Sequence, residues 1–105
     1  MGITVYWTQF AEDKLNDIYN FYESEAGTRI AQKLINGIVD KTIGLSKSPL
    51  IGQKEQLLGD RSQEFRYLIY KSYKIIYWIN KENKRIEIAN IFDCRQNPEK
   101  MKEIK

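Results

Sequence analysis

The chain of 105 residues contains no histidine and only one cysteine, Cys94. The absence of histidine excludes every mechanism that needs an imidazole as an acid, a base or a metal ligand. A single cysteine excludes an intrachain disulfide and leaves a zinc ion only carboxylates and one thiol as ligands. We therefore expect no metal and no cofactor, and we interpret Cys94 as a small, half-buried residue at a strand end, since a nucleophilic thiol would lack its usual base.

Long apolar runs are also missing. No segment approaches the roughly 20 apolar residues that span a bilayer, and the N-terminal MGITVYWTQF lacks the basic and apolar regions of a secretory signal. We expect a cytoplasmic protein without a membrane partner. The hydrophobic share of 42% and the charged share of 30% are typical of a folded chain, and the length predicts a single domain over residues 1–105.

Positive charge is concentrated in the second half of the chain. Residues 1–52 carry five basic and six acidic side chains, whereas residues 53–105 carry twelve basic and eight acidic ones. This distribution suits a phosphate backbone or an acidic protein as partner. An excess of this size is also ordinary on a solvated surface, so it does not decide the function alone.

The first half of the chain predicts a strand followed by two helices. Residues 3–7 are rich in β-formers, Thr8 is a suitable helix N-cap, and apolar residues recur at helical spacing through 9–24. A second helix runs from Thr28 to about Ser46, where Pro49 ends it. The two helices are predicted to form a hairpin with one shared apolar side.

The second half predicts a connector and three strands. The connector covers residues 49–63, and the strands lie within residues 64–98. If Lys71-Ser72 and Glu82-Asn83 are the turns, the strands pair antiparallel. Asn97-Pro98-Glu99 is typical of the start of a short helix, with Met101 and Ile104 as its apolar contacts. The predicted fold is α+β: a helix hairpin on one face of a small, mostly antiparallel sheet, in the order βααβββ.

These turns assign the strand side chains to two faces. The core face, against the helices, carries Leu68, Ile75, Tyr77, Ile79, Ile86, Ile88 and Phe92. The opposite face carries Phe65, Tyr67, Ile69, Lys74, Ile76, Trp78, Arg85, Glu87, Ala89, Ile91 and Arg95. We expect Lys74 and Arg95 to meet beside Tyr67, and an exposed apolar patch there to mark a partner site. A slip of one residue in register would exchange the faces.

Several segments resemble the RelE/ParE superfamily of toxins from bacterial type II toxin–antitoxin systems. VYWTQFAEDKLNDIYNFY resembles that family's strand-to-helix start, and SPLIGQKEQLLG resembles its connector. EFRYLIYKSYKIIYWI resembles its hairpin, and IEIANIFDCRQNP resembles its last strand, which ends in a basic residue. The resemblance covers nearly the whole chain, although each segment is degenerate.

The resemblance implies one of two activities and a protein partner. RelE-like members are ribosome-dependent mRNA endonucleases, whereas ParE-like members bind DNA gyrase and lack an RNase site. A cognate antitoxin neutralises both. The RelE-like activity uses a C-terminal tyrosine or histidine-tyrosine pair, but this chain has neither residue after Arg95.

The resemblance also nominates site residues. Arg95 matches the basic residue after the last strand, and Lys74 stands where the family usually has arginine. A lysine there keeps the charge but loses the two-pronged phosphate contact. Glu55 matches loosely a connector glutamate that some nucleases use. Together with Tyr67, these residues are the catalytic candidates if the chain is a nuclease.

Each nominated residue also has a structural interpretation. Arg66, Lys74 and Arg95 are candidates for target or phosphate binding, but Arg66 suits packing better and Arg95 has Asp93 or Glu87 as possible ion-pair partners. Phe65, Tyr67 and Trp78 are candidates for partner binding or plain packing. A connector glutamate such as Glu55 is usually solvated.

The missing tyrosine and histidine favour a ParE-like growth inhibitor with a gyrase-type target and no enzymatic activity. The first alternative is a ribosome-dependent endonuclease that acts on mRNA through Lys74 and Arg95. The second is a non-toxic basic module that binds nucleic acid or protein.

Overall fold

A computed structural model describes residues 3–103. The chain begins with strand β1 (Thr4–Trp7) and continues with helices α1 (Gln9–Ala26) and α2 (Thr28–Ile43). The predicted N-cap is confirmed, because the Thr8 hydroxyl accepts a hydrogen bond of 3.2 Å from the Ala11 amide. Gly27 separates the helices at a φ of 95°, a conformation that glycine adopts readily. Helix α2 ends at Ile43, and the short 3₁₀ helix η1 (Gly44–Ser46) completes the predicted span.

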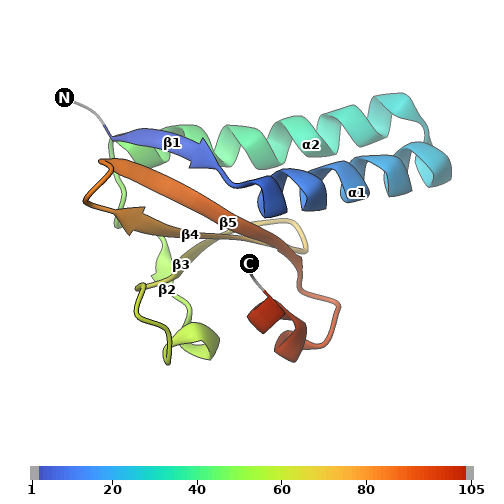
Figure 1. Cartoon of the computed structure of the whole chain (residues 1–105). Helices are drawn as coiled ribbons and strands as arrows, with labels where there is room; N and C mark the ends of the chain where they lie inside the picture. The colour runs from blue at the N-terminus through green and yellow to red at the C-terminus, as the bar shows by residue number, and fades with distance from the viewer. Residues whose placement is uncertain (1–2, 104–105) are drawn as a thin grey trace.

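The remaining elements form the rest of a five-stranded sheet and two short helical turns. Strand β2 (Gln53–Lys54) and the 3₁₀ helix η2 (Gln56–Leu58) lie in the connector. Strands β3 (Arg66–Tyr70), β4 (Tyr73–Asn80) and β5 (Arg85–Asp93) follow, and the 3₁₀ helix η3 (Pro98–Glu103) ends the described chain. The order in the sheet is β1-β5-β4-β3-β2, with β1 parallel to β5 and the other pairs antiparallel. Figure 1 shows the helix hairpin on one side of this sheet and the two turns η2 and η3 on the other.

The fold class is confirmed, with one addition. The two-residue strand β2 was expected as part of a connector without regular structure. Both predicted turns are confirmed by the register, in which Tyr70 pairs with Tyr73 and Ile79 pairs with Ile86. Lys71 takes the positive φ of 52° that a two-residue turn requires. The C-terminal turn is also found, with Met101 buried, whereas Ile104 lies outside the described residues.

A β-bulge reverses the predicted faces at the end of β5. Ile76 pairs with Asn90 while Tyr77 pairs with Ile88, so Ala89 is an extra residue in the ladder. Beyond the bulge, Ile91 belongs to the helix-side core and Phe92 packs on the opposite side. The predictions that Phe92 faces the helices and that Ile91 and Arg95 face away are therefore wrong. One inserted residue shifts the two-residue period by one step.

The sheet buries apolar side chains on both faces. The helix-side cluster joins residues of α1 and α2 to β4 and β5, with Ile75, Tyr77, Ile86 and Ile88 at 0% exposure. The opposite cluster packs Phe65, Ile76 and Phe92 beneath Leu58 of η2 and Met101 of η3. The predicted exposed patch is therefore a second, smaller core, because the connector and the C-terminal turn fold over it.

Tyr77 and Arg66 fasten the connector to the sheet. The buried Tyr77 hydroxyl donates to the Pro49 carbonyl at 2.8 Å and accepts from the Gly52 amide at 2.9 Å. Arg66 donates to the Gly52 carbonyl at 2.8 Å and to Glu64 at 2.9 Å. These contacts fix the segment that leads into Glu55. Within residues 3–103, no helix combines the length and the apolar character needed to cross a membrane.

Candidate functional site

Arg95 stands just after β5, beside α1 and the start of β4. Its guanidinium donates two hydrogen bonds to the Asp93 carboxylate, at 2.9 Å from Nε and 2.8 Å from Nη2. The Arg95 backbone amide donates to the same carboxylate at 2.9 Å. Nη2 also reaches the hydroxyl of Tyr22 at 3.4 Å and that of Tyr73 at 3.5 Å. Asp93 thus holds one edge of the Arg95 guanidinium, yet 59% of the Arg95 side chain is exposed.

The pKa values around Arg95 follow from these contacts. Hydrogen bonds from Arg95 lower the pKa of Asp93. Hydrogen bonds with Tyr73 and Arg95 lower the pKa of Tyr22, whereas burial raises the pKa of Tyr73. The Asp93 carboxylate raises the pKa of Arg95 in turn, so this guanidinium stays charged at every physiological pH. The Arg95 site thus offers a fixed cation framed by two phenols.

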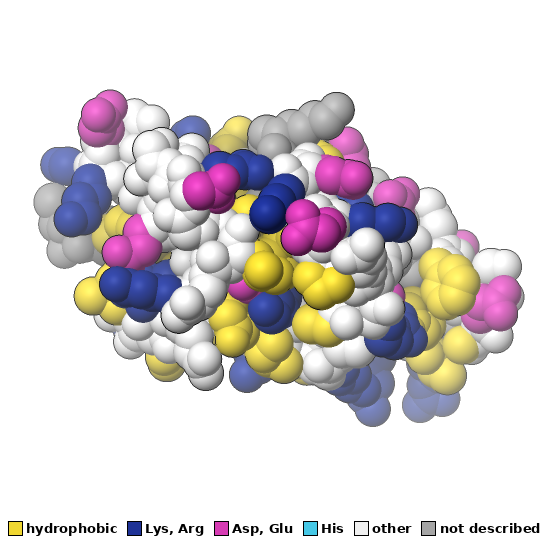
Figure 2. All heavy atoms as spheres, turned by 90° about the horizontal axis from the view of Figure 1, so that it is seen from below, with side chains coloured by type: hydrophobic (Ala, Val, Ile, Leu, Met, Phe, Trp, Pro, Cys, Tyr) yellow, Lys and Arg dark blue, Asp and Glu magenta, His cyan; other side chains and the backbone are white. Residues whose placement is uncertain are grey.

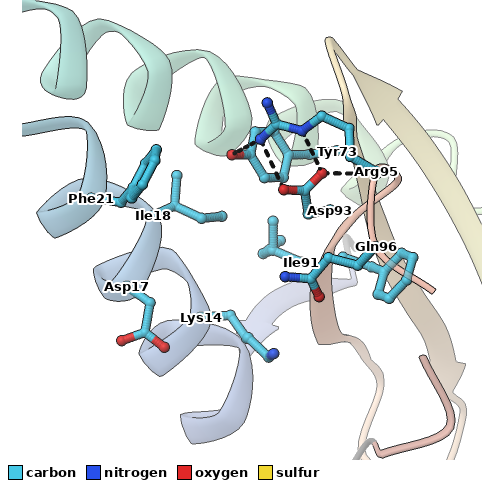
Figure 3. Close-up of a pocket in the computed structure, with 10 residues that line it drawn as sticks. Lys14, Asp17, Ile18, Phe21, Tyr73, Ile91, Asp93, Arg95 and Gln96 are labelled. Carbon is cyan, nitrogen blue, oxygen red and sulfur yellow. Dashed lines mark hydrogen bonds and ion pairs between the residues drawn. The ribbon is translucent and has the colours of Figure 1, made fainter. Parts of the chain in front are cut away.

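An open hollow of about 310 Å³ lies beside this cation, between α1 and the end of β5. Figure 3 shows Phe21 and Ile18 on α1 facing Tyr73, Ile91 and Arg95 across it. Lys14 and Asp17 lie on the α1 side of the hollow. An apolar floor with charged residues at its border is the common composition of a binding surface.

A second cluster lies on the opposite face of the sheet. The Lys74 ammonium forms an ion pair of 2.7 Å with the Glu55 carboxylate and lies 4.2 Å from the centre of the Tyr67 ring. Glu55 is buried, with 4% of its side chain exposed, and it also accepts a hydrogen bond of 3.2 Å from the Leu57 amide. The Tyr67 hydroxyl donates to Gln53 at 3.2 Å. The expectation of a solvated Glu55 is wrong, because this carboxylate caps η2 and pairs with Lys74.

The structure separates the predicted basic residues. Lys74 does lie beside Tyr67, but Arg95 lies on the helix side of the sheet, so the expected meeting of Lys74 and Arg95 does not occur. Arg66 is engaged with the connector, which confirms its structural interpretation. Figure 2 shows acidic and basic side chains interspersed on the face away from the helices. The described residues of this face therefore form no continuous basic field.

The predicted partner-binding residues differ in exposure. Phe65 is buried beneath η2 and η3 and offers a partner no surface in this conformation. Tyr67 and Trp78 are half-buried at the margin of the second core. Among residues 3–103, no group of three or more histidine, cysteine, aspartate or glutamate side chains is placed to hold a metal ion.

Sequence reasoning missed Tyr22 and Tyr73 as members of the Arg95 site. Tyr22 lies within the apolar helical spacing of residues 9–24, which indicates core packing, and Tyr73 directly follows the predicted turn at Lys71-Ser72. The bulge that brings Arg95 to them leaves no clear mark in the sequence. The ion pair of Arg95 with Asp93, in contrast, was one of the two expected pairs and is confirmed.

Comparisons with known proteins agree with this architecture. A family model described as the ParE toxin of the type II toxin–antitoxin system parDE matches residues 5–98. A solved structure of a chromosomal ParDE TA system from P. aeruginosa contains a similar chain, with a TM-score of 0.72 and 22% sequence identity. That alignment covers 87% of this chain and 95% of the other. No curated protein gives a significant match.

At 22% identity the structural likeness establishes the fold, whereas the family model covers most of the chain. The match includes both clusters around Arg95 and Lys74, and such a system pairs its toxin with an antitoxin. The chain therefore belongs to the ParE toxin family of type II toxin–antitoxin systems.

Proposed function

We propose that this toxin inhibits growth by binding a DNA gyrase-type target in the cytoplasm, with Arg95 as its principal contact. The observation that carries the proposal is the geometry of Arg95. Its charge is anchored by Asp93 at 2.8–2.9 Å, while 59% of the side chain remains exposed. An anchored but accessible arginine loses little conformational freedom on binding, and arginine is enriched among the residues that contribute most to the affinity of protein interfaces.

The second cluster supports binding rather than RNA cleavage. Cleavage of RNA through its 2′-hydroxyl needs a base, a proton donor and a cation that stabilises the phosphate. Lys74 is already neutralised by a carboxylate at 2.7 Å, and that carboxylate is buried. Lys74 and Glu55 neutralise each other's charge, so the pair stabilises the connector more than it offers a cation to a phosphate.

One observation favours ribosome-dependent mRNA cleavage as a second candidate function. The structure brings together three of the four catalytic candidates, Glu55, Lys74 and Tyr67, although Glu55 lies in the connector, 19 residues before Lys74 in the sequence. A carboxylate, an ammonium and a phenol in one place are the groups that such a reaction would use. For this role, substrate binding would have to break the ion pair between Glu55 and Lys74.

Because the two sites lie on opposite faces of the sheet, single substitutions can separate the two functions. The gyrase proposal predicts that Arg95→Ala relieves growth arrest in bacteria that lack the antitoxin, while Lys74→Met with Glu55→Gln remains toxic. Loss of an arginine at the centre of an interface costs about 2 kcal/mol or more, which weakens binding roughly 30-fold. Arg29→Ala is the matched control, since it removes an exposed arginine from α2, outside both clusters.

The readouts are growth, DNA damage and primer extension on abundant mRNAs. Growth arrest with induced DNA damage and intact mRNA supports the gyrase proposal. Cuts within translated codons that disappear in the Lys74 and Glu55 variant would establish the nuclease instead. Normal growth with the unaltered chain would contradict both target proposals.

A further inference from the structure

Strand β1 forms one edge of the sheet. It pairs with β5 on one side, and within residues 3–103 no strand pairs with its other side. Figure 1 shows β1 as an outer strand. The backbone amides of Thr4 and Thr8 donate toward the β5 side at 3.3 and 3.2 Å. Because bonding residues alternate along a parallel strand, the N–H and C=O groups of Val5 and Trp7 point away from β5.

This edge lacks most of the features that keep sheet edges unpaired. Natural edges are protected by charges, prolines, bulges or short length. At the other edge, β2 has two residues and one of them is Lys54. Strand β1 has four residues, and residues 3–7 contain neither a charge nor a proline. Val5 and Trp7 pack against the helix-side core and remain only half-buried, so this core is open along β1.

A second copy of β1 fits this edge in antiparallel orientation. When Tyr6 lies opposite Tyr6 of the second copy, each Val5 lies opposite the other copy's Trp7. All four of these Val5 and Trp7 residues have outward N–H and C=O groups, so the pairing makes about four backbone hydrogen bonds. It also creates two pairs of an aromatic and a β-branched side chain, which stabilise neighbouring strands. The open edges of the two cores then cover each other.

Charge favours a second copy over an acidic or basic segment as the occupant. The strand itself is uncharged. Beside it, the Arg85 guanidinium lies 4.0 Å from the centre of the Tyr6 ring and is paired with the buried Glu87. The edge therefore offers a charged segment no uncompensated partner. The net charge of +3 on each copy is largely screened at physiological salt, where the Debye length is about 8 Å.

We propose that the free toxin forms a two-fold dimer in which the β1 strands of two copies pair antiparallel and join the two sheets. Such an interface is isologous, since both copies contribute the same strand. The pairing leaves Arg95 uncovered, because β1 lies beside residues 85–88 whereas Arg95 follows the opposite end of β5. The dimer thus carries two accessible Arg95 sites. The inference does not depend on the identity of the target.

Sedimentation velocity of the full-length chain, separated from its antitoxin, measures the dimer without any target. A short strand pair is a small interface, so the chain should pass from monomer to dimer between about 1 and 300 µM. Tyr6→Lys places two ammonium groups opposite each other at the two-fold axis and should weaken the dimer about 10-fold. Ile69→Lys on β3 is the matched control, because Ile69 is 46% exposed and Tyr6 is 42% exposed. It should change the dimer affinity by less than about twofold.

A disulfide cross-link tests the register independently of affinity. The background is Cys94→Ser, which removes the only natural thiol. In this background Tyr6→Cys brings two Cα atoms to about 4.5 Å across the dimer axis, within the range of a disulfide. Thr4→Cys, at another exposed position of β1, leaves them about 14 Å apart and beyond that range. Mild oxidation should therefore give a covalent dimer of the first variant and leave the second monomeric.

Several results would overturn the dimer proposal. They are a monomer over the whole concentration range, equal weakening by Tyr6→Lys and Ile69→Lys, and equal cross-linking of the two cysteine variants. A chain that stays monomeric but loses antitoxin binding in Tyr6→Lys would assign the edge to a strand of the antitoxin instead. Circular dichroism checks that each variant is folded. If Tyr6→Lys unfolds, the cross-link decides, and absence of a covalent dimer in Tyr6→Cys then refutes the pairing.

Discussion

Replacement of Tyr77 by phenylalanine tests how the connector is held on the sheet. The hydroxyl of this residue lies at 0% exposure and makes two hydrogen bonds, to the Pro49 carbonyl and from the Gly52 amide. Phenylalanine keeps the ring and removes only the oxygen. The Gly52 amide is then left in a buried position without its partner.

The expected loss follows from the burial of the two orphaned groups. A buried donor that loses its partner costs about 1–3 kcal/mol, and the half-buried Pro49 carbonyl adds about 1 kcal/mol because water reaches it in part. The free energy of unfolding should therefore fall by about 2–4 kcal/mol. For a chain of this size, that loss lowers the melting temperature by roughly 10–25 °C.

Urea denaturation followed by circular dichroism measures this loss directly. Tyr67→Phe is the matched control, since its hydroxyl reaches only the exposed Gln53 side chain and its removal should cost less than about 1 kcal/mol. If Tyr77→Phe and Tyr67→Phe were equally stable, the connector would not depend on the buried hydroxyl and the reasoning would be refuted.

The remaining predictions concern charge, packing and pH. Lys74→Met should destabilise the fold by about 2–3 kcal/mol, because Glu55 is left as a buried anion. In a double-mutant cycle measured by urea unfolding, adding Glu55→Gln should recover at least about 1 kcal/mol. Additive losses would show that the two side chains are not coupled. Gly52→Ala should lower the melting temperature, because the added Cβ would lie 2.7 Å from a backbone oxygen of β3. Gly44→Ala should leave the melting temperature unchanged, because the space around Gly44 is open. Equal melting temperatures of the two variants would contradict this packing. Burial raises the pKa of Tyr73 above its ordinary value of 10.0, so its contribution to stability is complete below about pH 10 and declines as the pH rises further. Urea unfolding between about pH 8 and 11 should show this decline and a weaker one in Tyr73→Phe, whereas identical pH profiles would exclude Tyr73 as a source.

The sequence was sufficient for the secondary structure and most of the pairing. Helical spacing, the Thr8 cap and Pro49 predicted both helices to within a few residues. The turn at Lys71-Ser72 then determined the β3–β4 register, because apolar residues on one face must meet apolar residues on the other strand. These are local or nearest-neighbour properties, and they depend little on the rest of the fold.

The sequence could not show which face of the sheet each side chain after Ala89 occupies. The segment IEIANIFD continues an ordinary strand pattern, and nothing in it shows where an extra residue is accommodated. Both Ile91 and Phe92 are apolar and suit either core. The bulge places Ile91 in the helix-side core and Phe92 against Leu58 and Met101 on the far side of the sheet.

By itself, then, the sequence determined the α+β class, the family and the absence of imidazole chemistry, because composition, periodicity and turns act along the chain. The tertiary structure decided which charged residues share a site. It moved Arg95 to Tyr22 and Tyr73 through a single bulge, and it buried Glu55 against Lys74 by folding the connector over the sheet. Both results depend on contacts between residues far apart in the chain, which no local pattern records.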